Sequence, residues 1–128
     1  MYLIDTDWIV DYLKGKEEAV KTLQKLFDNE LYISIISIAE IYEGIEEAKN
    51  KDETTKSLED FLQGVVVLNI NKETCKKFGE IRNNLRKKGN LIGDFDILIA
   101  STAIINDLKI ITNNKKHFER IEEIKFLK

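Results

Sequence analysis

The sequence alternates short apolar runs with longer segments whose apolar residues recur every three or four positions. The apolar runs at 2–4, 31–36, 65–68 and 110–112 have the length of strands, and the segments between them have the periodicity of helices. Strands that alternate with helices form mostly parallel sheets covered on both faces. We therefore predict an α/β fold with a mostly parallel central sheet of four to five strands and helices on both faces. The fifth strand would lie at 125–127.

The composition predicts one domain that spans residues 1–128. A chain of 128 residues with 43% hydrophobic residues buries a sizeable core without disulfides. The single Cys75 has no partner in the chain, so we expect a reducing compartment, the cytoplasm, and place this residue in the core. No apolar stretch approaches the roughly 20 residues of a membrane span. Asp5 interrupts the first apolar run, so we expect no export signal.

The charges are unevenly distributed along the chain. The formal net charge of -3 argues against a surface that is basic everywhere. Residues 71–90 nevertheless contain seven basic residues against two acids, and residues 40–60 contain eight acids against three lysines. A lone charged run is usually a solvated helix face, so the basic segment gains meaning only beside a site that acts on phosphate.

Three acids interrupt segments that are otherwise apolar, and an unpaired buried carboxylate is costly. Asp5 follows the first strand, where it would also serve as the N-cap of the next helix. Glu40 follows the strand at 31–36, where a solvated helix residue is the simpler interpretation. Asp96 stands near the start of an apolar helix and shares a face with the apolar residues that follow it in that helix. Asp94 is better placed as the cap of that helix.

Together these acids indicate a divalent-metal site. Mg²⁺ prefers oxygen ligands and is typically held by one or two carboxylates together with substrate phosphate. Asp5 and Asn113-Asn114 follow strands, and ligands of such sheets bind beyond the carboxyl ends of the strands. Asp7, Asp11 and Glu43 are possible further members, although Asp11 and Glu43 are more simply solvent-facing helix residues.

Four segments, which together reach from one end of the chain to the other, resemble the motifs of PIN-domain nucleases. Residues 2–10 (YLIDTDWIV) are similar to the first motif, an apolar strand followed by Asp-Thr-Asn, and Asp7 departs from it at the Asn. Residues 34–44 (SIISIAEIYEG) are similar to the second, with Glu40 and Gly44 in the matching places. Residues 92–100 (IGDFDILIA) resemble the third, in which Asp96 is the matching acid. Residues 110–118 (IITNNKKHF) resemble the closing motif. Four motifs in this order are a specific signal.

The resemblance implies a metal-dependent endoribonuclease that leaves a 5′-phosphate and a 3′-hydroxyl. Mg²⁺ or Mn²⁺ would be held by Asp5, Glu40 and Asp96, and the substrate would be a structured RNA such as a tRNA or an rRNA loop. Supporting groups around the site would be Thr6, Ser37, Asp94, Thr112 and Asn114, the last at a position that is often Asp, so we expect one tightly held metal. Contacts to the RNA backbone would come from Arg82, Arg86, Lys87 and Lys88.

The length and the ending FERI at 118–121 look most like the VapC branch of this family. That resemblance implies the ribonuclease half of a toxin–antitoxin pair. We therefore expect a small antitoxin partner that places a basic side chain near the acidic site, and a homodimer.

Three alternatives are weaker or remain open. The motif of haloacid-dehalogenase-type phosphatases has Thr or Val at the position of Ile9. A phospho-receiver domain needs an Asp at the end of its central strand, and here the apolar run Val65–Leu68 is followed by Asn69. A non-catalytic PIN-like module that binds RNA or protein stays open. His117 is the only histidine, which excludes a Ser-His-Asp or multi-histidine site, and we expect it at the surface.

Overall fold

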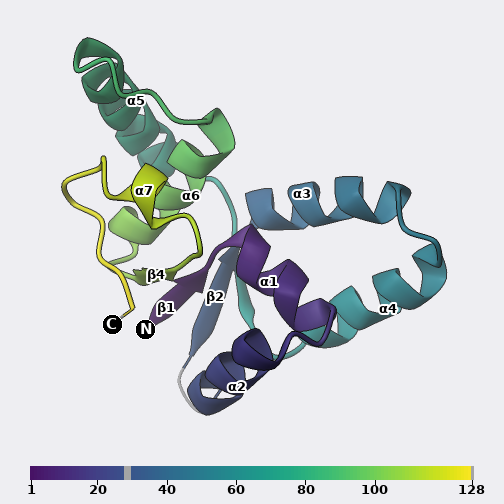
Figure 1. Cartoon of the computed structure of the whole chain (residues 1–128). Coiled ribbons are helices and arrows are strands. Elements are labelled where there is room, and N and C mark those ends of the chain that lie inside the picture. The colour runs from purple at the N-terminus through teal and green to yellow at the C-terminus, as the bar shows by residue number, and fades with distance from the viewer. Residues whose placement is uncertain (28–29, 128) are drawn as a thin grey trace.

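The computed structural model describes residues 1–27 and 30–127, and its centre is a four-stranded parallel sheet (Figure 1). The strands are β1 (Tyr2–Ile4), β2 (Leu31–Ser34), β3 (Val66–Leu68) and β4 (Lys109–Ile111), in the order β3-β2-β1-β4. Every pair is parallel, which confirms the predicted class. Within 125–127 only an isolated parallel bridge forms, between Ile110 and Phe126.

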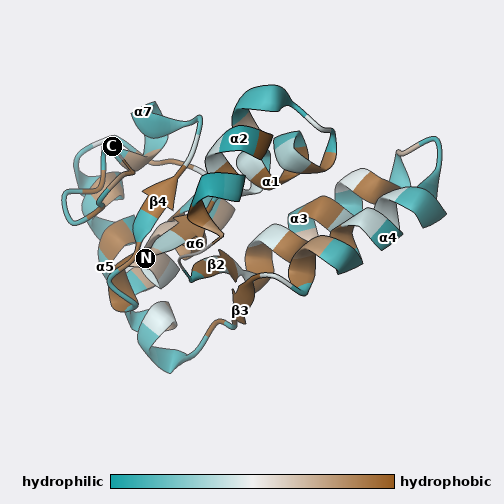
Figure 2. Cartoon of the chain, turned by 90° about the horizontal axis from the view of Figure 1, so that it is seen from below, coloured by the Kyte–Doolittle hydropathy of each residue, from teal (hydrophilic) through white to brown (hydrophobic). Residues whose placement is uncertain are grey.

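Helices cover both faces of this sheet (Figure 1). One face carries α1 (Thr6–Leu13), α2 (Glu17–Leu26), α3 (Ile35–Glu46) and α4 (Lys51–Leu62). The other carries α5 (Lys72–Lys87), α6 (Asp94–Ile105) and α7 (Lys115–Phe118). α3 and α4 run side by side and project beyond the sheet (Figures 1 and 2). None of the helices described here has the length and apolar character that crossing a membrane requires.

The two cores arise from the alternation of side chains along each strand. In β1, Leu3 packs with α5 and α6, whereas Ile4 packs with the helices of the opposite face. Ile110 and Ile111 of β4 divide in the same way. Successive residues of a strand point to opposite faces, so each strand contributes to both cores. Apolar residues accordingly dominate the strands in Figure 2.

Two strand predictions need correction. The strand predicted at 31–36 ends at Ser34, because the Ser34 hydroxyl accepts a 3.0 Å hydrogen bond from the backbone N–H of Ile36 and caps α3. The predicted buried strand at 65–68 is an edge strand, in which Val66 is 38% exposed.

Cys75 is exposed, so its predicted place in the core is wrong. The buried stripe of α5 runs instead through Thr74, Ile81 and Leu85. Cys75 lies one residue, about 100° of helical rotation, from Thr74 and faces outward.

The sheet topology creates a crevice at the carboxyl end of β1. From β1 the chain passes through α1 and α2 to β2 on one side, while β4, on the other side of β1, is reached through α5 and α6. Connections that leave adjacent strands toward opposite faces open a crevice at the strand ends. Asp5 and Thr112 follow β1 and β4 at this place.

Candidate metal centre

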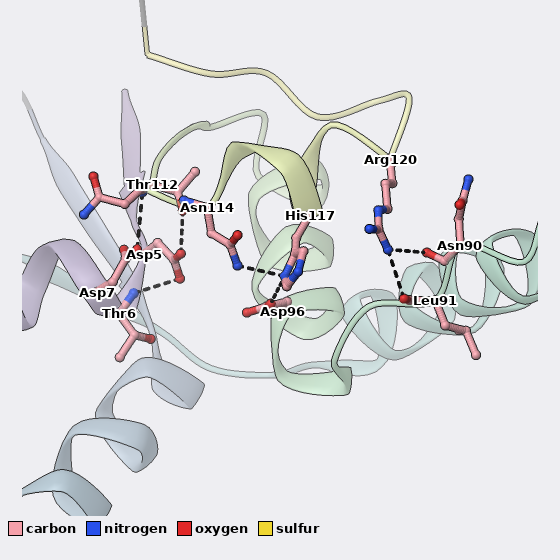
Figure 3. Close-up of polar contacts among 11 residues, drawn as sticks. Asp5, Thr6, Asp7, Asn90, Leu91, Asp96, Thr112, Asn114, His117 and Arg120 are labelled. Atoms are coloured by element: carbon pink, nitrogen blue, oxygen red, sulfur yellow. Dashed lines mark hydrogen bonds and ion pairs between the residues drawn. The ribbon is translucent and has the colours of Figure 1, made fainter.

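Asp5 is a buried carboxylate and also the N-cap of α1. Its Oδ1 accepts a 2.8 Å hydrogen bond from the Thr6 N–H, and its Oδ2 accepts one of 2.7 Å from the Thr112 hydroxyl (Figure 3). Burial raises the pKa of Asp5 to about 7, although the hydrogen bond from Thr112 opposes this rise and repulsion by Asp7 adds to it. Asp5 is only 5% exposed. One carboxylate oxygen caps α1 and the other faces Thr112, so the cap and the site interpretations of this residue are compatible.

Glu40 projects from α3 and is held by the side chain of Thr6, which Ser37 contacts in turn. The Thr6 hydroxyl donates a 2.7 Å hydrogen bond to Glu40 Oε1 and lies 2.9 Å from the hydroxyl of Ser37. A hydroxyl has one proton, so Ser37 donates to Thr6 while Thr6 donates to the carboxylate. Burial raises the pKa of Glu40, the bond from Thr6 opposes the rise, and repulsion by Asp96 adds to it.

Asp96 lies in the first turn of α6, with its side chain 25% exposed. His117 Nδ1 is 3.4 Å from Asp96 Oδ2, and Asn114 Nδ2 is 2.7 Å from the same His117 nitrogen (Figure 3). Asp96 repels Asp5 and Glu40 strongly enough to contribute to the raised pKa of both. The three carboxylates therefore share one electrostatic neighbourhood.

The carboxylates are neighbours without being a preformed set of metal ligands. Within 1–27 and 30–127, no three acidic, histidine or cysteine side chains already form a cluster that holds a metal ion. Hydrogen bonds hold each of Asp5, Glu40 and Asp96 separately, while each carboxylate oxygen keeps a further lone pair.

Asp7 joins this acidic neighbourhood. Its pKa is raised by burial first and also by repulsion from Asp11 and Asp96, while backbone hydrogen bonds from Trp8 and Asn113 oppose the rise. Oδ2 accepts a 3.3 Å hydrogen bond from the Asn113 N–H, whereas Oδ1 is buried without a hydrogen-bond partner. An unpartnered buried carboxylate oxygen favours a nearby cation.

The supporting residues predicted around the site divide into two groups. Thr6 and Thr112 contact site carboxylates directly, Ser37 acts through Thr6, and Asn114 contacts Thr112 and His117. Asp94 lies apart from them, and its predicted role as helix cap is wrong. Gly93 is the N-cap of α6, and Asp94 is exposed and pairs with Arg82 at 2.9 Å.

Two of the four basic residues predicted to contact RNA are engaged by carboxylates. Arg82 pairs with Asp94, and Lys88 pairs with Glu122 at 3.1 Å. Arg86 and Lys87 are exposed and have no carboxylate partner within the described ranges.

The sequence places His117 only at the surface, yet this residue contacts Asp96. Its half-exposed side chain reaches a carboxylate 21 positions earlier in the chain. Nothing local in the sequence indicates that pairing, because only the packing of α7 beside α6 creates it.

A groove adjoins the site on the side of α1, α3 and α4. It has a volume of about 460 Å³, and Glu40 is one of the residues that line it. Its apolar lining includes Val10, Leu13, Ile41 and Ile45.

The sequence model of the PIN domain family matches residues 2–124 of this chain. The chain belongs to the PIN domain family. Two curated relatives of this PIN domain are the Ribonuclease VapC2 of Rickettsia felis and the tRNA(fMet)-specific endonuclease VapC of Salmonella typhimurium. The first is 32% identical over 126 residues, which are 97% of this chain and 94% of the relative. The second is 29% identical over 124 residues, which are 97% of this chain and 94% of the relative.

Among solved structures, the PIN domain is similar to a chain in the crystal structure of VapBC2 from Rickettsia felis bound to a DNA fragment from their promoter. The TM-score is 0.91 at 31% sequence identity, and the match covers 98% of this chain and 96% of that one.

Proposed function

We propose that the chain is a Mg²⁺- or Mn²⁺-dependent endoribonuclease and the toxin of a toxin–antitoxin pair. The observation that carries the proposal is the position of Asp5, Glu40 and Asp96, at the end of β1, on α3 and on α6, in one neighbourhood where Asp96 repels both of the others. Such repulsion is relieved by a divalent cation. Relatives named as ribonucleases, similar over nearly the whole chain, support RNA as the substrate.

The residues present fit a hard divalent ion. All three acids offer oxygen ligands, and the unpartnered Oδ1 of Asp7 adds negative charge beside them. Asp5, Glu40 and Asp96 would hold the ion, which when bound supplies positive charge that offsets the charge developing on the scissile phosphate.

The chain's own hydroxyls keep the carboxylates in place during this reaction. Thr112 holds Asp5, and Thr6, supported by Ser37, holds Glu40. Water adds to phosphorus and the bond to the 3′-oxygen breaks, which leaves a 5′-phosphate and a 3′-hydroxyl.

The substrate class that we propose first is tRNA. The Salmonella relative is named as a tRNA(fMet)-specific endonuclease, and its similarity covers 97% of this chain. An rRNA loop is the second substrate to be tested. Both are cytoplasmic RNAs, so we propose the cytoplasm as the place of action.

The proposed partner is a small antitoxin protein. The similar Rickettsia chain is part of a VapBC2 complex. The largely apolar groove that Glu40 helps to line offers such a partner a surface beside the site, where one of its basic side chains would meet the acids. A homodimer also remains a proposal, which light scattering on the purified protein tests.

The decisive experiment is cleavage of tRNA and rRNA by the purified protein with Mn²⁺. We expect cleavage that EDTA abolishes, and a loss of at least about 100-fold in Asp96→Asn and Glu40→Gln, the range in which charge-stabilising groups act. Glu59→Gln, the same change at an exposed position of α4, is the matched control and should retain activity. Cleavage that persists in Asp96→Asn would contradict the proposed site.

The same experiment addresses the non-catalytic alternative. A PIN-like binding module would bind RNA in a gel-shift assay, would not cleave it with any divalent metal, and would bind equally well after Asp5→Ala.

A further inference from the structure

The segment that follows β4 contacts two site carboxylates from different elements (Figure 3). At its start, the Thr112 hydroxyl donates to Asp5 Oδ2 at 2.7 Å. At its far end, His117 Nδ1 lies 3.4 Å from Asp96 Oδ2. Residues 112–117, which we call the strap, therefore connect the end of β1 with the first turn of α6.

Asn114 joins the two ends of the strap. Its backbone N–H donates to the Thr112 hydroxyl oxygen at 2.9 Å, and its side-chain amide lies 2.7 Å from His117 Nδ1. The hydrogen-bonded chain thus runs without a break from Asp5 through Thr112, Asn114 and His117 to Asp96 (Figure 3).

Two contacts of the residues that follow His117 fix its position in the fold. Phe118, the next residue, is fully buried and anchors α7 in the core. Arg120 Nη1 donates to the carbonyl oxygens of Asn90 at 3.4 Å and Leu91 at 3.2 Å, which ties the chain after α7 to the loop before α6 (Figure 3).

The two neighbours of His117 Nδ1 determine whether this nitrogen carries a hydrogen. A nitrogen lone pair that faces the Asp96 carboxylate is repelled by it, whereas an Nδ1–H is attracted. An Nδ1–H can donate to both neighbours if the oxygen of the Asn114 amide faces His117. A half-turn of the amide exchanges its nitrogen and oxygen and leaves the shape of the side chain unchanged. The imidazole then donates toward Asp96 and Asn114 together.

We propose that His117 and Asn114 are positioning residues that hold Asp96 at its place relative to Asp5. This inference rests on the proposed function in one respect, namely that Asp96 holds a divalent ion. Asn114 occupies a position where the family often has an acid. In this chain it then contributes a hydrogen-bonded bridge in place of a further carboxylate ligand.

Mn²⁺ affinity, measured by electron paramagnetic resonance of the free ion, tests the strap. His117→Ala and His117→Gln should each weaken the affinity by about 10- to 100-fold, the usual effect of removing a hydrogen bond that orients a ligand. His117→Asn should stay close to the unmodified protein, because the amide N–H of Asn occupies the place of Nδ1–H while that of Gln occupies the place of Nε2. Glu119→Gln, at an exposed position just after α7, is the control and should leave the affinity unchanged.

A ¹⁵N spectrum of the His117 ring gives a second readout that does not depend on metal or RNA. The unmodified protein without metal should show the Nδ1–H tautomer at pH 8. Thermal unfolding in EDTA shows whether each variant is folded, and the contrast between Gln and Asn carries the test if the Ala variant is not.

Equal Mn²⁺ affinity in the Ala, Gln and Asn variants, equal losses in Gln and Asn, or an Nε2–H tautomer would each overturn the strap. If the unmodified protein cleaves RNA and His117→Ala and His117→Gln bind Mn²⁺ as it does, the strap is wrong and the nuclease function stands. If the unmodified protein binds Mn²⁺ with the predicted order of variants but cleaves no RNA, the nuclease function is wrong and the strap stands. Absence of Mn²⁺ binding in the unmodified protein would overturn both.

Discussion

The Thr112 hydroxyl at the end of β4 donates a 2.7 Å hydrogen bond to the Asp5 carboxylate at the end of β1. This bond is buried and joins neighbouring parallel strands at the point where both end. It opposes the effect of burial on the pKa of Asp5, so it favours the ionised form that a metal site needs.

Removal of this hydroxyl should weaken metal binding. In Thr112→Val the shape is kept but the donor is removed, so we expect Mn²⁺ affinity to fall about 10- to 100-fold and the free energy of unfolding to fall by about 1 kcal/mol. Thr112→Ser keeps the donor and is the matched control. Mn²⁺ titration and urea unfolding measure the two effects, and equal affinities in the Val and Ser variants would contradict the role of this bond.

The stability of the metal-free protein should depend on pH through Asp5. Burial raises the pKa of Asp5 from 3.8 to about 7, so the folded state favours the protonated form. This group therefore stabilises the fold at low pH, and the contribution is lost as the pH rises from about 4 to about 7. The raised pKa values of Asp7 and Glu40 act in the same direction. Urea unfolding in EDTA between pH 5 and pH 8 should show this decline.

Asp5→Asn removes the titrating group and serves as the comparison for that series. At pH 8 in EDTA we expect the variant to be more stable than the unmodified protein by about 2 kcal/mol, since a pKa change of one is worth about 1.4 kcal/mol and the altered bond to Thr112 offsets part of the gain. Its pH dependence should be shallower. A variant that is less stable than the unmodified protein at pH 8 would contradict the burial of an ionised carboxylate.

The fold was largely predictable because it depends on periodicity. The apolar runs and the helical stripes indicated the order of strands and helices, and parallel pairing followed from that order. The buried position of Asp5 was also predictable, because a carboxylate directly after a buried strand is unusual.

Other features depend on contacts that are distant in sequence. Cys75 was misplaced because Cys75 and Thr74 both fall near the apolar stripe of α5, and only the packing of that helix shows which one faces inward. The pairing of Arg82 with Asp94 and the contact of His117 with Asp96 join residues from different helices. Sequence spacing does not determine such pairs.

RNA affinity should depend unequally on the basic residues of α5. Arg82 and Lys88 are paired with Asp94 and Glu122, whereas Arg86 and Lys87 have no carboxylate partner among the described residues. We expect the double variant Arg86→Ala/Lys87→Ala to weaken RNA binding in EDTA. The slope of the logarithm of affinity against the logarithm of salt concentration should become shallower by about 0.7 for each single-strand phosphate that is no longer neutralised. Arg82→Ala/Lys88→Ala should have the smaller effect. Equal effects of the two double variants, measured by fluorescence anisotropy over a salt series, would remove α5 from the RNA interface.

The exposure of Cys75 predicts rapid reaction with a thiol reagent in the native protein. The thiol is exposed on α5, so one equivalent of Ellman's reagent should react without denaturant. Cys75→Ser should change the free energy of unfolding by less than about 0.5 kcal/mol, as at other surface positions. The control moves the thiol by one residue, in Thr74→Cys/Cys75→Ser, because Thr74 is 1% exposed and a thiol there should react only on unfolding. If Cys75 is protected until the protein unfolds, the register of α5 against the sheet is wrong, and the surface assigned to Arg86 and Lys87 is wrong with it.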